Sequence, residues 1–227
     1  FVPQRIEFAR VSYRYTRSWF LPLISPVPVR DWAIQNLSFA LNSELVLFVG
    51  DSSSGKSTIL KLIQRQVLPT EGFITYNTSM SEQTVLSALP VYLGAEKPRF
   101  DFSRTIQELV LSSNDPLRLE AANELLNSVG LQQELYSRSS QLSPSEQYRL
   151  QLVIASLESI FGYAPSDTQV LPAPVLLLDE WLDKQPTSIV HIVENALNRL
   201  AQELGAIVCV VTHKPERWKT SKVISLR

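Results

Sequence analysis

We predict an α/β fold with a mostly parallel sheet flanked by helices, and two observations support this prediction. Three apolar runs, at 45–49, 175–178 and 206–211, are typical of buried strands. Segments with the helical spacing of apolar residues lie between these runs, so strands and helices alternate, as in a parallel sheet covered on both faces. The chain has 227 residues and 44% hydrophobic content, so it is long enough to bury such a core.

The first part of the chain alternates apolar and polar residues, which predicts β-strands. Residues 6–13 form one such pattern and residues 34–41 form another. Between them, the proline-bearing segment 18–31 is too apolar for an ordinary solvated loop. Because large exposed apolar patches are rare, this segment either folds back on the protein as an apolar flap or docks against a partner. Its apolar residues are Trp19, Phe20, Leu21, Leu23, Ile24 and Val27.

The middle and the end of the chain continue the alternation of strands and helices. Short strands are expected at 73–76 and 89–93, and the region from 105 to 138 has the apolar spacing of helices. Two longer helices are predicted at about 144–161 and at 187–204. Each buried strand is therefore followed by a segment that can cross back over the sheet.

The segment from Gly50 to Ser57 reads GDSSSGKS and fits the phosphate-loop pattern G-x-x-x-x-G-K-[ST]. A buried strand precedes it and a helix begins near Lys56, which is the context that this motif requires. Backbone N–H groups of such a loop face phosphate oxygens, Lys56 reaches the β- and γ-phosphates, and Ser57 binds Mg²⁺. We therefore predict nucleoside triphosphate binding by Gly50, Asp51, Ser52, Ser53, Ser54, Gly55, Lys56, Ser57 and Thr58.

Two further groups of polar residues follow buried strands. Asp179 and Glu180 come at the end of the strand at 175–178, where ligands bind in open α/β sheets. We expect Asp179 to hold Mg²⁺ and Glu180 to polarise the water that attacks the γ-phosphate. His213 follows the strand at 206–211 and can donate a hydrogen bond to the γ-phosphate. The alternative for His213 is a partly buried structural histidine.

Composition restricts the partners and the compartment. The net charge of −1 gives no field that could hold nucleic acid or an anionic membrane, so we expect no nucleic acid partner. The single Cys209 lies in an apolar run, so no disulfide framework is possible, which suits a reducing compartment. No apolar segment reaches the length of a membrane-spanning helix. The sequence starts at Phe1, and no targeting segment is visible in it.

The order of these motifs resembles the nucleotide-binding domain of an ABC (ATP-binding cassette) ATPase. The resemblance covers nearly the whole chain, and it implies a single domain, 1–227, with a P-loop NTPase core. It also implies an N-terminal antiparallel β subdomain, at about 1–44 and 71–93, and an α-helical subdomain at about 100–150. ATP and Mg²⁺ are the implied cofactors. Tyr15 resembles the aromatic residue that stacks on adenine in this family.

The resemblance implies a function as the ATP-binding and ATP-hydrolysing subunit of an ABC transporter. Such a subunit energises transport through a separate transmembrane transporter subunit, peripheral to the membrane on its cytoplasmic, stromal or matrix face. Lys56, Glu180 and His213 would then be catalytic, and Ser57 and Asp179 would hold the metal. The alternatives are a soluble ABC-type ATPase that acts as an assembly or regulatory switch, and a nucleotide-binding regulator that hydrolyses little ATP.

Three departures from the family pattern are visible. The signature Leu-Ser-Gly-Gly-Gln appears here as Leu142-Ser143-Pro144-Ser145-Glu146, without either glycine. In the family, the signature serine binds the ATP that is held by the phosphate loop of a second subunit. Because Pro144 removes an N–H and Glu146 adds a negative charge, the half-site that Ser143 forms should be weak. The family has a glutamine after the strand that follows the phosphate-loop helix. This glutamine is missing here, and Glu96 is the nearest polar substitute. The segment after Glu180, Trp181-Leu182-Asp183-Lys184, is shorter than in the family, and Asp183 is a candidate for the aspartate that follows the catalytic glutamate. We therefore expect a heterodimer with a second ABC ATPase subunit rather than a homodimer.

Overall fold

The computed structural model describes most of the chain, including all the predicted motifs. The described residues are 1–2, 4–17, 27–28, 32–78, 89–111, 113–162, 171–219 and 222–226. Trp19, Phe20, Leu21, Leu23 and Ile24 of the predicted apolar flap lie outside this set. The choice between a flap and a docking surface therefore stays a prediction.

The elements follow the predicted order closely. The strands are β1 (Gln4–Tyr13), β2 (Thr16–Arg17), β3 (Val27–Pro28), β4 (Ile34–Leu41), β5 (Leu45–Val49), β6 (Glu71–Thr78), β7 (Val91–Leu93), β8 (Val175–Asp179), β9 (Ile207–Val211) and β10 (Val223–Ser225). The α-helices are α1 (Lys56–Ile63), α2 (Ile106–Val110), α3 (Pro116–Ser128), α4 (Pro144–Phe161) and α5 (Thr187–Leu204). Short 3₁₀ helices are η1 (Gln132–Glu134), η2 (Ser139–Gln141) and η3 (Pro215–Arg217). The predicted strand at 89–93 is shorter than expected, and β10 was not predicted.

The central sheet is parallel throughout, which confirms the predicted fold class. Its strand order is β10-β5-β9-β8-β7, and every neighbouring pair among these strands is parallel. The three inner strands β5, β9 and β8 are buried almost completely, as their apolar sequences predict. Because all strands run the same way, the phosphate loop after β5 and the polar residues after β8 and β9 meet at one edge of the sheet.

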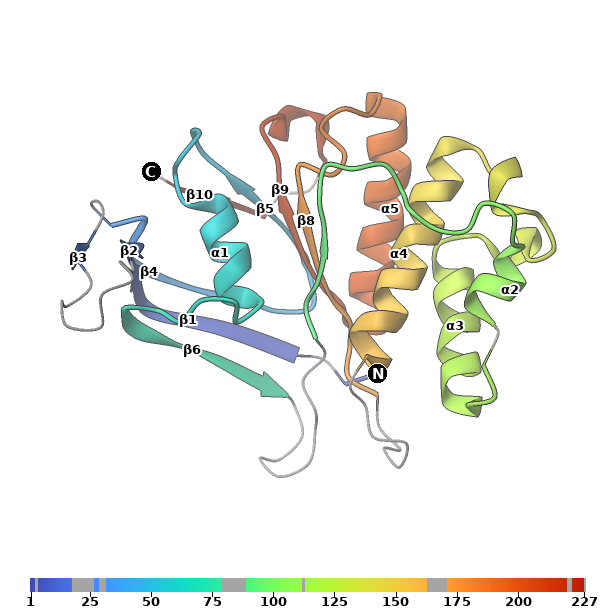
Figure 1. Ribbon diagram of the computed structural model, residues 1–227, viewed down its shortest axis with the longest axis horizontal. Helices are drawn as coiled ribbons and strands as arrows, with labels where there is room; N and C mark the ends of the chain where they lie inside the picture. Colours follow the sequence, from blue (N-terminus) through green and yellow to red (C-terminus); the bar gives the residue numbers. More distant parts are fainter. Residues whose placement is uncertain are drawn as a thin grey trace.

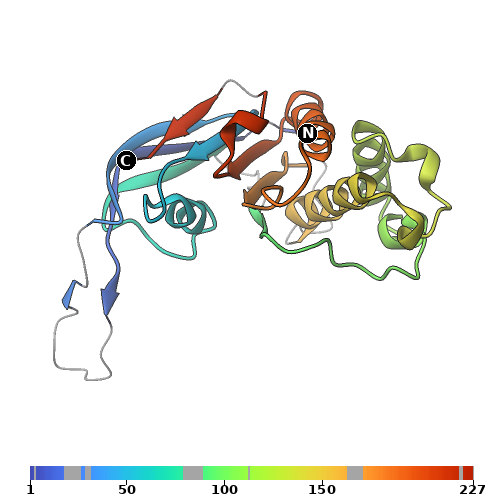
Figure 2. The same cartoon turned by 90° about the horizontal axis from the view of Figure 1, so that it is seen from above.

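A second, antiparallel sheet covers one side of α1. Its order is β4-β1-β6, and α1 lies between this sheet and the parallel sheet (Figure 1). One apolar core joins the three layers through side chains such as Phe8 of β1, Ile59 of α1 and Val46 of β5. Strands β2 and β3 form a separate antiparallel pair that projects from the end of the β1–β4 ladder (Figure 2). The phosphate-loop helix is thus held by sheets on both sides.

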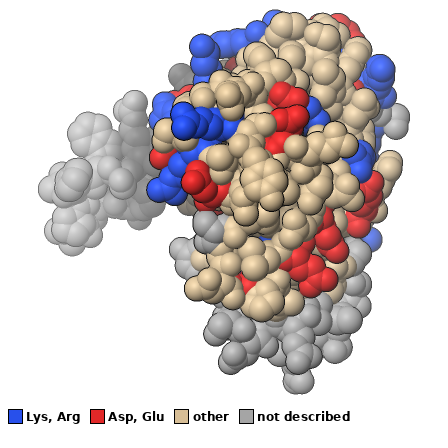
Figure 3. Space-filling view, turned by 90° about the vertical axis from the view of Figure 1, so that its right-hand side faces the viewer, with Lys and Arg blue, Asp and Glu red and all other residues tan. Residues whose placement is uncertain are grey.

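Helices cover the other face of the parallel sheet. Helices α4 and α5 pack next to it, and α2 and α3 lie farther out, at the end opposite the antiparallel sheet (Figure 1). Helix α2 starts at a capping box formed by Thr105 and Glu108, and Asp115 caps α3 ahead of Pro116. The outer face of this helical end carries Lys, Arg, Asp and Glu side chains interspersed with uncharged surface (Figure 3). Within the described part of the chain, no helix is long and apolar enough to cross a membrane.

A buried serine joins the helical layer to the sheet. Ser159 on α4 accepts a hydrogen bond from the Val175 N–H at 3.0 Å, at the start of β8, and its hydroxyl donates to the Leu89 carbonyl. The Leu89 N–H in turn donates to the Ser159 carbonyl at 3.0 Å. This contact explains why β7 begins later than predicted, since Leu89 is bonded to α4 instead of a strand.

We expect Ser159→Ala to lower the free energy of unfolding by about 1–3 kcal/mol, because the buried Val175 N–H loses its acceptor. Ser156→Ala on the same helix is the matched control. The Ser156 hydroxyl is also buried, but it donates to Leu152 of its own helix at 2.7 Å, so its loss leaves no backbone donor unpaired. Chemical denaturation of both variants measures the difference. Equal losses of stability in the two variants would contradict this account.

Candidate nucleotide-binding and catalytic site

The phosphate loop is a tight turn between β5 and α1. Gly55 caps α1 with a φ of +90°, a conformation that residues with a side chain rarely adopt. The buried Lys56 folds back over the loop, and its Nζ donates to the carbonyl oxygens of Gly50 and Asp51, both at 2.8 Å. Ser54 Oγ is buried without a hydrogen-bond partner among the described residues. The loop therefore holds a cation and a spare hydroxyl at the start of a helix, which suits an anion.

A cleft of about 520 Å³ opens over this loop. It is lined by Tyr15, Trp32, Ala33, Ser52, Ser53, Gly55, Lys56, Ser57, Thr58, Glu180 and His213. The cleft thus brings together nine of the residues predicted from the sequence, from four separate segments of the chain. Trp32 and Ala33 also line it and were not predicted. The predicted residues Gly50, Asp51, Ser54, Asp179 and Ser143 are not among those that line it.

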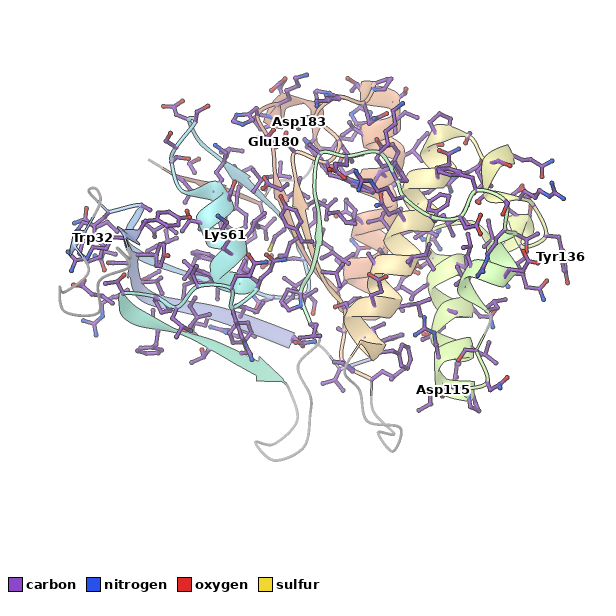
Figure 4. The ribbon with its side chains drawn as sticks, in the orientation of Figure 1. Trp32, Lys61, Asp115, Tyr136, Glu180 and Asp183 are labelled. Carbon is purple, nitrogen blue, oxygen red and sulfur yellow. The ribbon has the colours of Figure 1, made fainter. Side chains whose placement is uncertain are left out.

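Aromatic side chains form one wall of the cleft. The Tyr15 hydroxyl lies 3.1 Å from Thr58 Oγ1, and Lys61 Nζ lies 5.7 Å from the centre of the Tyr15 ring. Trp32 comes from the segment that enters β4, and the Arg14 guanidinium lies over its ring at 5.1 Å. Figure 4 shows Trp32 on the side of the antiparallel sheet, across α1 from Glu180. Two rings at this wall can stack on a nucleotide base.

The opposite wall of the cleft carries Glu180 and His213. Asp179 ends β8, and Glu180 follows it with a φ of +53°, a left-handed conformation that is uncommon outside glycine and concentrated at functional sites. The Glu180 N–H still donates to the Val211 carbonyl at 2.9 Å, so the strand turns without losing its pairing to β9. Glu180 Oε1 lies 2.8 Å from His213 Nε2. A carboxylate and an imidazole in contact can orient a water and move a proton.

Asp183 ties the loop after β8 to the loop after β9. Its Oδ1 accepts from Thr212 Oγ1 at 2.6 Å and its Oδ2 accepts from the His213 N–H at 2.9 Å. Its carbonyl accepts from Lys214 Nζ at 2.9 Å and from Arg217 Nη1 at 3.0 Å. Glu180 and Asp183 lie close together above the end of β8 (Figure 4). Asp183 therefore fixes the backbone that carries His213 beside Glu180.

Tyr92 reaches Asp179 from the neighbouring strand. Its hydroxyl donates to Asp179 Oδ2 at 2.9 Å. Partial burial, together with this hydrogen bond and the charges of Asp179 and Glu180, raises the pKa of Tyr92 to about 12, so the phenol stays protonated at neutral pH. Glu96, the substitute suggested by the sequence, instead pairs with Arg99 at 2.5 Å, and the two side chains are 68% and 79% exposed. Tyr92 thus contacts Asp179, while the role suggested for Glu96 stays a prediction.

Ser143 caps the N-terminus of α4, ahead of Pro144. Its N–H and its hydroxyl both donate to Glu146 Oε2, at 2.8 Å and 2.7 Å. These hydrogen bonds, the hydroxyl first, and the charge of Arg149 lower the pKa of Glu146, so its carboxylate is charged at neutral pH. The helix start therefore already holds an anionic group of its own.

Two buried side chains connect α4 to the loop after β8. Trp181, directly after Glu180, donates from Nε1 to Gln151 Oε1 at 3.1 Å and packs edge-on against Tyr148. Gln185 Nε2 donates to the Tyr148 hydroxyl at 2.6 Å. Both Trp181 and Tyr148 are at least 96% buried. The position of the Glu180 loop therefore depends on packing against the same helix that Ser143 begins.

The donors near the loop suit a magnesium ion that is held mainly by phosphate. Within the described residues, no three His, Cys, Asp or Glu side chains cluster as a metal site. A Ser57 hydroxyl and an Asp179 carboxylate are the donors that the sequence predicts. Mg²⁺ in nucleotide sites uses one or two protein oxygens together with phosphate oxygens and water. These residues therefore fit Mg²⁺ as a companion of a bound nucleotide.

Comparison of the sequence with protein families gives a match to the ABC transporter family over residues 34–160. The thiamine import ATP-binding protein ThiQ of Brucella abortus is 31% identical over 179 residues, which are 76% of this chain and 69% of that protein. The phosphonates import ATP-binding protein PhnC 2 of Haloquadratum walsbyi is 28% identical over 138 residues, or 56% of this chain. This match spans about half (49%) of the length of that relative.

The fold has solved relatives as well. An ATP-binding cassette of an ABC transporter, in its ADP conformation, superposes with a TM-score of 0.61 at 13% sequence identity. The superposition covers 100% of this chain and 87% of that one. At this identity the likeness concerns the fold, and it agrees with the family match and with the loop geometry described above. The chain belongs to the ABC transporter family of ATP-binding proteins.

Proposed function

We propose that this chain binds and hydrolyses ATP and so energises an ABC transporter through a separate membrane subunit. The observation that carries the proposal is the cleft in which Lys56, Ser57, Glu180 and His213 meet from three different strand ends. A phosphate loop alone would support binding only. A carboxylate in contact with a histidine, on the wall facing the loop, adds the groups that water attack on a phosphate requires.

In this mechanism the polar residues act on a charge or a proton, and the aromatic residues hold the base. ATP is the substrate, and Mg²⁺ bound with it would neutralise part of the charge of its phosphates. Lys56 and the loop N–H groups bind the phosphate oxygens, and Ser57 and Asp179 would provide oxygen ligands for the metal. Glu180 orients the attacking water and accepts its proton, while His213, positioned by Asp183, donates a hydrogen bond to the γ-phosphate. Tyr15 and Trp32 stack on the adenine.

The membrane partner and the location are part of the proposal. ThiQ and PhnC 2 are named as ATP-binding proteins of import systems. We infer a similar arrangement here, with this chain peripheral to a membrane on its cytoplasmic, stromal or matrix face and bound to a transmembrane subunit. The substrate of transport is decided by that partner. Purification from membranes in mild detergent tests this inference, because the partner should copurify with the chain.

We further propose a heterodimer, in which a second ABC ATPase subunit faces this chain. The support is the start of α4, where the Ser143 hydroxyl is bonded to the charged Glu146. A γ-phosphate that approached this helix would meet a like charge, and Pro144 removes one N–H from the helix start. A partner with an ordinary signature would complete the site over Lys56. The opposite site, which uses Ser143, would be slow.

Lys56→Ala should weaken ATP binding by about 2–3 kcal/mol, because the phosphates lose a charge-assisted contact. Lys61→Ala is the control from the same helix. Lys61 is exposed and lies over the Tyr15 ring, so its loss should cost less than about 1 kcal/mol. Titration calorimetry in Mg²⁺ measures both affinities. Wild-type affinity in Lys56→Ala would contradict the proposed binding mode.

Glu180→Gln should retain ATP binding and slow hydrolysis by about 10²–10⁴-fold, because the amide cannot accept the proton of the attacking water. Glu203→Gln, at an exposed position on α5, controls for the loss of a negative charge. Phosphate release by the chain together with its partner subunit measures the rate. If Glu180→Gln hydrolyses ATP as fast as the wild type, the catalytic base is another residue.

Glu146→Gln should raise the slow hydrolysis of the isolated chain several-fold, because it removes the negative charge that faces an incoming phosphate. Glu146→Asp retains that charge and should leave the rate low. Rates measured against protein concentration separate association from chemistry. Fast hydrolysis by the wild-type chain alone, rising with the square of its concentration, would show that the homodimer is sufficient.

A further inference from the structure

The contact between Tyr92 and Asp179 crosses two neighbouring strands. Strands β7 and β8 are parallel, with Tyr92 beside Leu177 and Leu93 beside Leu178. The Tyr92 ring leans along the strands, and its hydroxyl reaches Asp179 Oδ2, two residues beyond its own partner in the sheet, at 2.9 Å. A tyrosine is long enough to span this offset, and its hydroxyl can donate to a carboxylate.

Gly94 provides the space for this orientation. A Cβ at Gly94 would lie 3.1 Å from Tyr92 Cε1, which is tighter than an ordinary contact, and 3.6 Å from the Tyr92 hydroxyl, which is an ordinary one. The backbone of Gly94 is not in the left-handed region, so an alanine there would face no conformational penalty. The glycine is therefore needed only because it leaves space for the Tyr92 ring. Gly94→Ala should displace this ring without changing the chemistry of the Tyr92 hydroxyl.

An aspartate that serves as a metal ligand needs a fixed orientation. The Asp179 carboxylate lies at the end of β8, where its side chain could otherwise rotate. A hydrogen bond to one of its oxygens fixes that rotation and directs the other oxygen. Outer hydrogen bonds of this kind are typical of metal ligands, and losing one costs about 10–100-fold in metal affinity.

We propose that Tyr92 is a positioning residue for the metal that binds with ATP, because its hydroxyl holds the Asp179 carboxylate in the orientation that receives the ion. The inference rests on the proposed function, since it assumes Mg²⁺-dependent ATP binding. It assigns this role to a tyrosine on β7, whereas Glu96 pairs with Arg99 at the surface.

The test measures ATP binding by the full chain with and without metal. Calorimetry in EDTA gives the affinity for free ATP, and titrations at increasing Mg²⁺ give the enhancement that the metal adds. Tyr92→Phe should bind free ATP within twofold of wild type and should need about 10-fold more Mg²⁺ for the same enhancement. Gly94→Ala should change in the same direction by a smaller factor. Mn²⁺ in place of Mg²⁺ allows the bound ion to be followed by its EPR spectrum, which should broaden in Tyr92→Phe.

Tyr76→Phe is the control for a merely structural hydroxyl. The Tyr76 hydroxyl donates to the carbonyls of Leu62 and Ile63, at 3.2 Å and 2.9 Å, so its loss should lower Tm and leave the metal response unchanged. A wild-type Mg²⁺ response in Tyr92→Phe would overturn the inference and leave the proposed function standing. A stronger response would overturn it too, because Tyr92 would then compete with the metal for Asp179. If wild type bound no ATP, the proposed function itself would fail.

Discussion

Strand β9 is hydrogen-bonded to β5 on one side and to β8 on the other, and the site depends on these two ladders. Phe48 and Asp179 both pair with Val211, so the three strands end within about one residue of each other. Their side chains are apolar and buried on both faces, and a slip in register would expose them. Hydrophobic burial thereby sets the distance between the phosphate loop, the acidic pair and His213.

Hydrogen bonds then position the side chains that the β5–β9 and β8–β9 ladders bring together. Asp183 bonds to the backbone of His213, Trp181 is anchored on α4, and Tyr92 holds Asp179. Each of these contacts joins segments that are far apart in sequence. The Trp181 contact also joins the loop after β8 to α4, the helix that Ser143 caps. A movement of α4 would therefore reach Glu180 through Trp181, a packed side chain directly beside it.

The sequence predicted the long elements well because their patterns are local. The helices at 144–161 and 187–204 have the predicted bounds, and the phosphate loop is a contiguous motif. Strand β10 was missed because it has only three residues, none of them buried, and so lacks an apolar run. Trp32 and Tyr92 were missed for another reason. Trp32 enters the cleft through the pairing of β1 with β4, and Tyr92 meets a residue 87 positions away, so neither contact has a local signal.

The present partners of Lys56 and Ser143 predict that the two ends of the proposed ATP site differ in this chain. Lys56 Nζ is bonded to two neutral carbonyls, so an anionic phosphate that replaced them would gain the attraction of opposite charges. Ser143 is bonded to a carboxylate whose pKa is lowered by that contact. A phosphate that replaced this carboxylate would gain no charge attraction and would still lie beside it. If ATP binds as proposed, we therefore expect the exchange of contacts to be favourable at the phosphate loop and unfavourable at the signature, in the same chain and with the same ligand.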